Sequence, residues 1–237
     1  TQLFAEGRLA ALPYAVYDGE DIVDALRLMQ RSHHVGKIVV RPPKRGVEER
    51  RTDLLRLRSD GTYIVIGGLG GFGLALVRRL AERGAGRIVL VGRKPPTAES
   101  AAALEQIRKL GAELDVRSLD AADPTSATEL FEDLAKSGVL IRGIFHSAMV
   151  LDDCLIESLD ADRLERVLRA KIAIAANLDR LSRDLRHLDH FVLFSSATTL
   201  VGNPGQANYV AGNAYLEELA RRRRQDGLPA LAVAWGP

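Results

Sequence analysis

Residues 64–85, IVIGGLGGFGLALVRRLAERGA, decide the fold. An apolar run leads directly into a glycine cluster, and the cluster opens a stretch with helical periodicity. Glycines allow a tight turn with positive φ and let backbone N–H groups approach an anion at a helix N-terminus. The strand, turn and helix together predict a dinucleotide phosphate site, and a purely structural glycine turn is the alternative. Two glycine frames fit: Gly68-x-Gly70-x-x-Gly73 and Gly67-x3-Gly71-x-Gly73.

Short apolar runs alternate with helical patterns along the following chain. Strands are predicted at 62–66, 87–91, 113–117, 141–146, 190–195 and 230–235, and helices near 72–84, 97–110, 124–136, 160–184 and 206–225. This alternation predicts an α/β fold, a Rossmann-like doubly wound parallel sheet covered by helices on both faces. Ligands of such sheets bind beyond the carboxyl ends of the strands.

Composition narrows the class of protein. The 237 residues, 46% hydrophobic and 27% charged, suit one α/β domain with an extension. A net charge of +2 gives no reason to expect nucleic acid or a membrane as partner, and the arginine run 221–224 is interpreted as a solvated helix end. The lone Cys154 excludes an internal disulfide and favours a reducing, cytoplasmic compartment. No metal site is predicted, because His33 and His34 are too isolated.

The amino-terminal part does not follow the strand and helix rhythm. Residues 1–40 predict a loop, a helix, a turn and a strand, and the polar, Pro-bearing stretch that follows is predicted to be a linker over 41–59. The nucleotide-binding domain is therefore expected at 60–237.

Arg93 and Asp120 indicate the kind of dinucleotide. NAD-specific folds place an acidic residue about 20 positions after the glycines to bind the ribose 2′-hydroxyl. Arg93 stands there instead, and a guanidinium suits a 2′-phosphate, so the sequence favours NADPH as the cofactor. The alternative is that Arg93 is only an exposed arginine at a strand end. Asp120 follows the third strand and is a candidate acceptor for the adenine amine, whereas Asp123 is the better helix cap.

Four later residues suggest a reaction. Ser196 closes the fifth predicted strand, Tyr209 opens the next helix, and Asn213 lies one turn further on. A free tyrosine has a pKa of about 10, so a cation must stabilise the phenolate before this side chain can act as an acid at neutral pH. Asn213 carries no charge, and Lys171 lies in the preceding helix. Each residue alone would be read as a cap, a packing residue or a solvated lysine.

The chain resembles the ketoreductase domain of type I polyketide synthases, in the extended short-chain dehydrogenase group, whose glycine spacing matches the second frame. The matching pieces cover about 60–237 and are IGGLGGFG, LVGR, LDAAD, FHSAMVLDD, AKIAIAANL, FVLFSS, GNPGQANYVAGNAYL and WGP. In this family asparagine replaces the lysine of the usual Tyr-x3-Lys, and the preceding helix supplies the lysine. The missing cation is then Lys171. The resemblance also implies a lid helix and a last strand beyond WGP, where the chain stops.

Roles follow from the resemblance. Tyr209 would protonate the carbonyl oxygen of the substrate, Ser196 would hold that oxygen, Lys171 would stabilise the tyrosinate, and Asn213 would order the lysine and a water. The resemblance further implies a set of residues that contact the cofactor: Gly67, Gly68, Leu69, Gly70, Gly71, Phe72, Gly73, Arg93, Asp120, Ser147, Ala148 and Pro237.

Stereochemistry is also implied by the resemblance. Leu151, Asp152 and Asp153 match the LDD motif of the B-type branch, and Val201 stands where the A-type branch has tryptophan. Pro204, Gln206 and Asn208 complete the expected substrate side. The expected product is a D-(3R)-hydroxyl, and the alternative is that the acidic pair only favours a helix start.

The expected context is a multidomain synthase. Residues 1–40 resemble the closing segment of an enoylreductase domain, so the expected partners are an acyl carrier protein bearing a β-ketoacyl chain and neighbouring synthase domains, in a homodimeric parent. Two alternatives remain open. One is the equivalent domain of a type I fatty acid synthase, and the other is a non-catalytic, structural ketoreductase-like domain.

Overall fold

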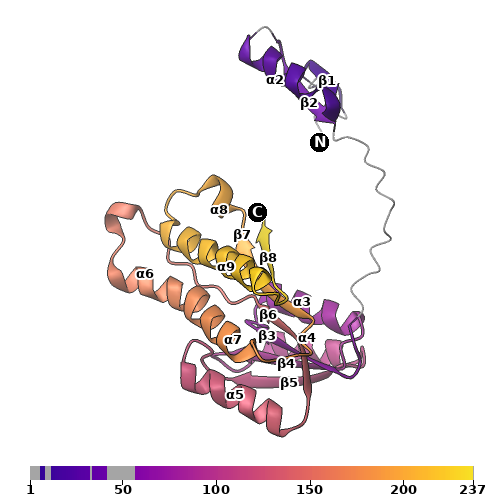
Figure 1. The fold of residues 1–237 in the computed structure, drawn as a ribbon, viewed down its shortest axis with the longest axis vertical. Coiled ribbons are helices and arrows are strands. Elements are labelled where there is room, and N and C mark those ends of the chain that lie inside the picture. Colours follow the sequence, from indigo (N-terminus) through magenta and orange to yellow (C-terminus); the bar gives the residue numbers. More distant parts are fainter. Residues whose placement is uncertain (1–5, 9–11, 33, 42–56, 237) are drawn as a thin grey trace. The chain divides into compact units, whose positions relative to one another are not determined.

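The computed structural model describes residues 6–8, 12–32, 34–41 and 57–236 (Figure 1). The chain divides into two compact units, 1–54 and 55–237. The predicted linker, 41–59, lies mostly outside the described residues, as do His33 and Pro237.

A six-stranded sheet forms the middle of the larger unit. Its order is β5-β4-β3-β6-β7-β8, and every neighbouring pair is parallel. The order reverses between β3 and β6, so this is the doubly wound, Rossmann-like sheet that the strand pattern predicts. The strands are β3 (Gly61–Ile66), β4 (Arg87–Gly92), β5 (Glu113–Ser118), β6 (Leu140–His146), β7 (His190–Ser196) and β8 (Leu231–Trp235), all six within one residue of the predicted positions.

Helices cover both faces of this sheet (Figure 1). Alternate strand residues point to opposite faces, so Tyr63 and Val65 pack with α3 (Gly71–Glu82) and α4 (Ala98–Arg108). Ile64 and Ile66 belong to the other core. That second core includes residues of α5 (Pro124–Lys136), α7 (Ile174–Ser182) and α9 (Ala207–Gln225).

The predicted helix at 160–184 is three elements. A π-helix, η3 (Arg169–Ala173), joins α6 (Ala161–Leu168) to α7. One short helix, α8 (Thr198–Val201), follows β7 and is absent from the predicted pattern, as is the 3₁₀ turn η2 (Ile156–Ser158). The prediction that Asp123 caps α5 is confirmed, since its carboxylate accepts from the Ser126 backbone N–H at 2.8 Å.

The interpretation of 221–224 as a solvated helix end is wrong for one residue. Arg223 is 0% exposed. Its guanidinium lies 3.8 Å from the Phe191 ring centroid and donates to Asp179 Oδ1 at 2.6 Å and Ser182 Oγ at 3.1 Å. Burial lowers the pKa of Arg223, against the opposing effect of Asp179. This arginine therefore joins α9, α7 and β7 inside the fold.

The smaller unit is a parallel β-α-β motif. Strands β1 (Tyr14–Asp18) and β2 (Lys37–Arg41) pair in parallel around η1 (Gly19–Asp21) and α2 (Ile22–Gln30). The helix and β2 match the prediction, but the expected loop contains β1. Ala25 is the one buried hydrophobic residue among those described in this unit, and many larger apolar side chains are exposed. The strands and the helix described in this unit therefore bury little apolar surface among themselves.

Candidate active site

A cavity of about 500 Å³ lies at the carboxyl ends of β3, β4 and β6. This is the switch point of the sheet, where the strand order predicts a ligand site. Ten of the residues predicted to contact a cofactor line it: Gly67, Leu69, Gly70, Gly71, Phe72, Gly73, Arg93, Asp120, Ser147 and Ala148. Gly68 is buried and is not among the lining residues; a Cβ there would come within 3.2 Å of the Leu90 side chain.

The glycine loop has the shape of a phosphate cradle. Gly67 has φ +84°, and a Cβ on it would lie 2.7 Å from the Ala148 nitrogen. A Cβ on Gly73 would lie 2.2 Å from the Gly67 carbonyl oxygen, so the first helical turn packs directly on the loop. A Cβ on Gly71, the first residue of α3, would meet nothing within 4 Å. The N-terminus of α3 is therefore open to the cavity and suits a pyrophosphate.

Charged side chains surround the other end of the cavity. Arg93 and Lys94 are exposed and line it. Asp120 accepts from the Ala122 backbone N–H at 3.0 Å and from Arg169 Nη2 at 2.9 Å. Burial would raise the pKa of Asp120, but these hydrogen bonds and the charge of Arg169 outweigh it and hold that pKa below its usual value. An ionised carboxylate is an acceptor only, which suits an adenine amine.

Lys171 is buried where the π-helix crosses α9. The residue is 2% exposed, and its Nζ donates to the carbonyl of Phe194 at 2.9 Å. Burial lowers the pKa of Lys171 to about 8. Nζ lies 5.4 Å from the ring centroid of Tyr209, and the approach needs Gly212, where a Cβ would lie 3.1 Å from the lysine Cβ. The predicted lysine and tyrosine thus lie at one site on separate helices.

The Tyr209 and Ser196 side chains are both partly accessible. Tyr209 Oη lies 3.7 Å from the sulfur of Met149, a residue that also lines the cofactor cavity. Ser196 Oγ accepts from the backbone N–H of Thr198 at 3.2 Å and from its hydroxyl at 3.0 Å. With its acceptor capacity used by Thr198, Ser196 keeps its own proton for another acceptor.

Asn213 is fully buried one turn after Tyr209. Its Nδ2 donates to the Tyr209 carbonyl at 3.0 Å. Its Oδ1 has no hydrogen-bond partner among the described residues. A buried acceptor without a hydrogen bond destabilises the fold. The Asn213 Oδ1 atom is therefore suited to accept a hydrogen bond from Lys171 or from a molecule in the cleft.

His146 is a site residue that the sequence reasoning missed. It ends β6, is 0% exposed, and its Nε2 lies 3.2 Å from the carbonyl oxygen of Lys171. Burial and the nearby Lys171 charge lower the pKa of His146 to about 3, so the ring is neutral. Because a carbonyl only accepts, Nε2 carries the proton. The signal was a histidine closing a buried strand next to the glycine loop.

The LDD segment is attached to the start of α9. Asn208 Nδ2 donates to the Asp152 carbonyl, and Gln206 Nε2 donates to Asp153 Oδ2, both at 2.9 Å. The Asp152 carboxylate pairs with Arg163 and Arg166. Pro204 belongs to the loop that precedes α9.

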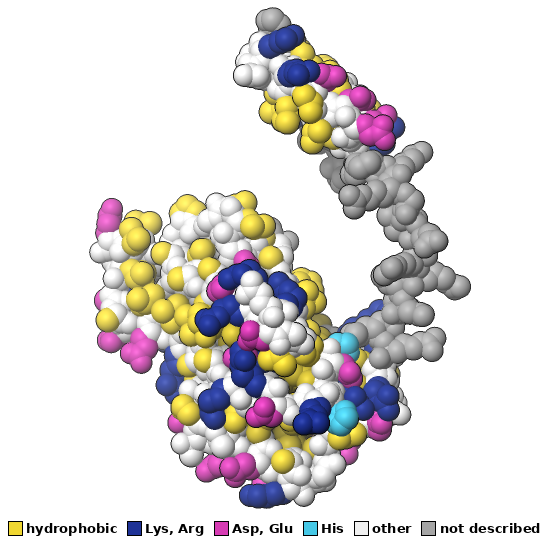
Figure 2. Space-filling view, viewed as in Figure 1, with side chains coloured by type: hydrophobic (Ala, Val, Ile, Leu, Met, Phe, Trp, Pro, Cys, Tyr) yellow, Lys and Arg dark blue, Asp and Glu magenta, His cyan; other side chains and the backbone are white. Residues whose placement is uncertain are grey.

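Exposed apolar side chains lie beside this segment. Figure 2 shows hydrophobic side chains gathered around α8 and the stretch before α6. The exposed apolar residues of these segments are Leu151, Leu155, Ile156, Leu200 and Val201, each more than half exposed. An apolar entrance of this kind suits a hydrophobic substrate.

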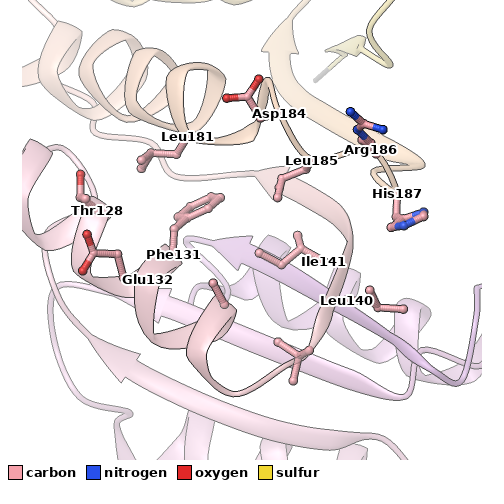
Figure 3. A pocket seen from close by; sticks show the side chains of 12 residues that line it. Thr128, Phe131, Glu132, Leu140, Ile141, Leu181, Asp184, Leu185, Arg186 and His187 are labelled. Atoms are coloured by element: carbon pink, nitrogen blue, oxygen red, sulfur yellow. The ribbon is translucent and has the colours of Figure 1, made fainter.

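A second cavity, of about 630 Å³, lies at the other end of the strands, where β6 begins. Figure 3 shows Phe131, Ile141, Leu181 and Leu185 around it. It contains none of the predicted site residues.

None of the described helices is both long and apolar enough to cross a bilayer.

The KR domain family matches residues 61–237. The chain is 37% identical, over its whole length, to a phenolphthiocerol/phthiocerol polyketide synthase of Mycobacterium tuberculosis, of which it spans 11%. It is 37% identical over 99% of its length to phthioceranic/hydroxyphthioceranic acid synthase of the same organism, again spanning 11%.

The solved structures that the chain resembles are also ketoreductases of polyketide synthases. PlmKR1, the ketoreductase from the first module of phoslactomycin biosynthesis in Streptomyces sp. HK803, is 41% identical with a TM-score of 0.71, covering 75% of this chain and 41% of that one. An A-type ketoreductase from a modular polyketide synthase is 40% identical with a TM-score of 0.70, covering 74% of this chain and 37% of that one.

Proposed function

The chain belongs to the KR domain family, the ketoreductase domains of polyketide synthases, and on that premise we propose that it reduces the β-ketone of an acyl chain to a hydroxyl with NADPH. The observation that carries the proposal is the buried Lys171 ammonium 5.4 Å from the Tyr209 ring, with Tyr209 Oη beside Met149, a residue that lines the glycine-lined cavity. Burying an ammonium without a counter-ion destabilises a fold by several kcal/mol. A domain with only a structural role would have no reason to keep such a group, so the buried Lys171 favours a catalytic role.

Each residue has one step in the proposed reaction. When bound, the nicotinamide supplies the hydride that adds to the ketone carbon. Tyr209 donates its proton to the carbonyl oxygen, and Ser196 donates a second hydrogen bond to the same atom. Lys171, an ammonium at neutral pH, leaves the Phe194 carbonyl and stabilises the tyrosinate that forms. Asn213 Oδ1 accepts from the lysine or from the water that returns the proton.

NADPH is proposed over NADH because of the charges at the far end of the cavity. Arg93 and Lys94 line the cavity and are exposed, and a guanidinium can bind a 2′-phosphate through two parallel hydrogen bonds. Asp120 would accept from the adenine amine. Pro237, predicted to contact the cofactor, lies outside the described residues.

We also propose a D-(3R)-hydroxyl as the product. Support comes from the LDD segment, whose carbonyl and carboxylate are held by Asn208 and Gln206 just ahead of Tyr209. This attachment ties the side from which the acyl chain enters to the helix that donates the proton. Chiral analysis of the alcohol formed from a β-ketoacyl thioester tests this proposal, and an L-hydroxyl would reject it.

The setting in a synthase is part of the proposal. The chain spans 11–12% of the curated polyketide synthases it matches, and their similarity includes the amino-terminal unit. We propose that 1–40 close an enoylreductase domain, supported by a β-α-β motif whose apolar side chains are mostly exposed. The substrate would then arrive on an acyl carrier protein, in a homodimeric cytoplasmic synthase. The relatives are polyketide synthases, which favours that setting over a fatty acid synthase.

Replacing one phenol hydroxyl tests the reaction. In the complete protein, Tyr209→Phe should lower kcat for reduction of a bicyclic ketone such as a decalone at least about 100-fold, with the NADPH Kd within twofold. Tyr215→Phe, on the same helix, is the matched control and should keep wild-type kcat. Wild-type activity in Tyr209→Phe would defeat the mechanism.

A further inference from the structure

Glu217 connects the tyrosine helix to the serine turn. It lies on α9, and its Oε1 accepts from Ser195 Oγ at 2.5 Å and from Thr199 Oγ1 at 2.8 Å. Ser195 precedes Ser196 directly, and Thr199 follows it by three residues. Among the residues that the structure describes, these are the side-chain hydrogen bonds between α9 and the segment 195–201.

The position of Glu217 on the helix gives this connection a geometric meaning. Tyr209, Asn213 and Glu217 are spaced by four residues and therefore share one face of α9. A helix rises about 1.5 Å per residue, so Glu217 lies about 12 Å from Tyr209 along one rigid element. A turn bonded to Glu217 is thereby held at a set position relative to Tyr209.

Proton directions in the turn favour a defined orientation of Ser196. Thr199 Oγ1 lies 2.9 Å from the Ser196 carbonyl as well as 2.8 Å from Glu217, but it has only one proton to donate. Ser195 Oγ and Thr199 Oγ1 both donate to Glu217 Oε1. Thr198 meanwhile donates twice to Ser196 Oγ. The proton of Ser196 is left for the cleft.

We propose that Glu217 is a positioning residue that sets Ser196 against Tyr209, so that both hydroxyls reach one substrate oxygen. This inference rests on the proposed ketone reduction. Glu217 does not touch the substrate and acts only through the turn that carries Ser196. A carboxylate that merely satisfied a buried hydroxyl at Ser195 would not need to bond Thr199 on the far side of the serine.

The decisive experiment is a double-mutant cycle in the complete protein. Glu217→Leu should lower kcat for ketone reduction about 10- to 100-fold, with the NADPH Kd within twofold, and Glu217→Gln, which keeps one acceptor oxygen, should recover most of that loss. In a Ser196→Ala background, adding Glu217→Leu should lower kcat by less than about twofold, because the effect of Glu217 passes through the serine hydroxyl that is already missing. An equal loss in both backgrounds would overturn the proposal.

Controls separate positioning from folding and from the reaction itself. Glu218→Leu, the exposed neighbour that pairs with Arg221, should leave kcat unchanged. Ser195→Ala and Thr199→Val each remove one bond without altering α9 and should each lower kcat about 3- to 10-fold.

Hydrogen exchange gives a readout that needs no activity. Backbone amides of 197–201 should exchange at least about tenfold faster in Glu217→Leu than in the wild-type protein. Their exchange rates should be unchanged in Glu218→Leu. Unchanged exchange in Glu217→Leu would reject the positioning role. Full activity in Tyr209→Phe would instead reject the reaction.

Discussion

The ammonium Nζ of Lys171 lies 5.4 Å from the ring centroid of Tyr209 while it is hydrogen-bonded to the carbonyl of Phe194. The cation that the proposed mechanism requires lies on a different helix, π-helix η3, rather than on α9. Its burial carries a cost in stability that a mutation can expose.

Lys171→Met should stabilise the protein while removing its activity. Burial lowers the pKa of Lys171 from 10.5 to about 8, so the buried ammonium destabilises the fold at pH 7 by up to about 3 kcal/mol. Methionine keeps most of the stem without the charge. Urea unfolding at pH 7 should show a gain of about 1–3 kcal/mol, and kcat should fall at least about 100-fold.

The same variant predicts a pH window. Between pH 8 and 10.5 the unfolded lysine binds a proton that the folded one has lost, so wild-type stability rises with pH there. The advantage of Lys171→Met should shrink across that window. A constant difference between the two proteins from pH 7 to 10.5 would contradict the buried cation.

His146→Gln should make the protein less sensitive to acid. The folded pKa of His146 is about 3, below the 6.5 of a free histidine, so protons bind the unfolded state first as the pH falls below 6.5. The free energy of unfolding of the wild-type protein should therefore be about 2 kcal/mol lower at pH 5 than at pH 7 through this histidine. Glutamine does not titrate but keeps a donor for the Lys171 carbonyl. Unfolding at both pH values checks it; His190→Gln, a half-buried histidine, is the control and should show a much smaller change.

Arg223→Leu should destabilise the larger unit by about 2–4 kcal/mol, because it leaves Asp179 and Ser182 without their buried donor. Arg222→Leu, the exposed neighbour, should change stability by less than about 0.5 kcal/mol. Urea unfolding measures both. Equal effects would mean that the run 221–224 acts as one solvated surface after all.

Arg93→Ala should weaken the proposed preference for NADPH over NADH. Loss of the guanidinium should raise the Kd for NADPH about 10-fold or more and leave the Kd for NADH within twofold. Arg78→Ala, an exposed arginine on α3 outside the cavity, is the matched control. Fluorescence titration of the reduced cofactors gives both constants, and a parallel rise for NADH would remove the 2′-phosphate role from Arg93.

The sheet could be predicted because most of its strands are short apolar runs, with both faces buried at β3 and β4, and because the edge strand β5 alternates polar and apolar residues. The glycine loop could be predicted because its function needs a local conformation. β1 (YAVYD) is also a short apolar run, but four of its five residues are exposed, and its pairing with β2 follows from the fold of the smaller unit. The burial of Arg223 could not be predicted, because Asp179 and Phe191 meet it only through the tertiary fold.

The site was predictable only in part for the same reason. Lys171, Ser196, Tyr209 and Asn213 stand in recognisable motifs. His146 and Glu217 act through a carbonyl and two hydroxyls from other elements, contacts that no local pattern records. The π-helix was missed because RVLRAKIAIAAN has the spacing of an uninterrupted α-helix.

That π-helix makes the lysine dependent on chain length as well as on residue type. A π turn holds one residue more than an α turn, and each α-helical residue rotates the chain by about 100°. Deleting a single alanine from Arg169–Ala173 would let the segment wind as a plain α-helix and swing the ammonium away from the tyrosine, with every named functional side chain still present. A homologue that lacks one residue here would keep the motifs but not the proposed pairing of the lysine with the tyrosine.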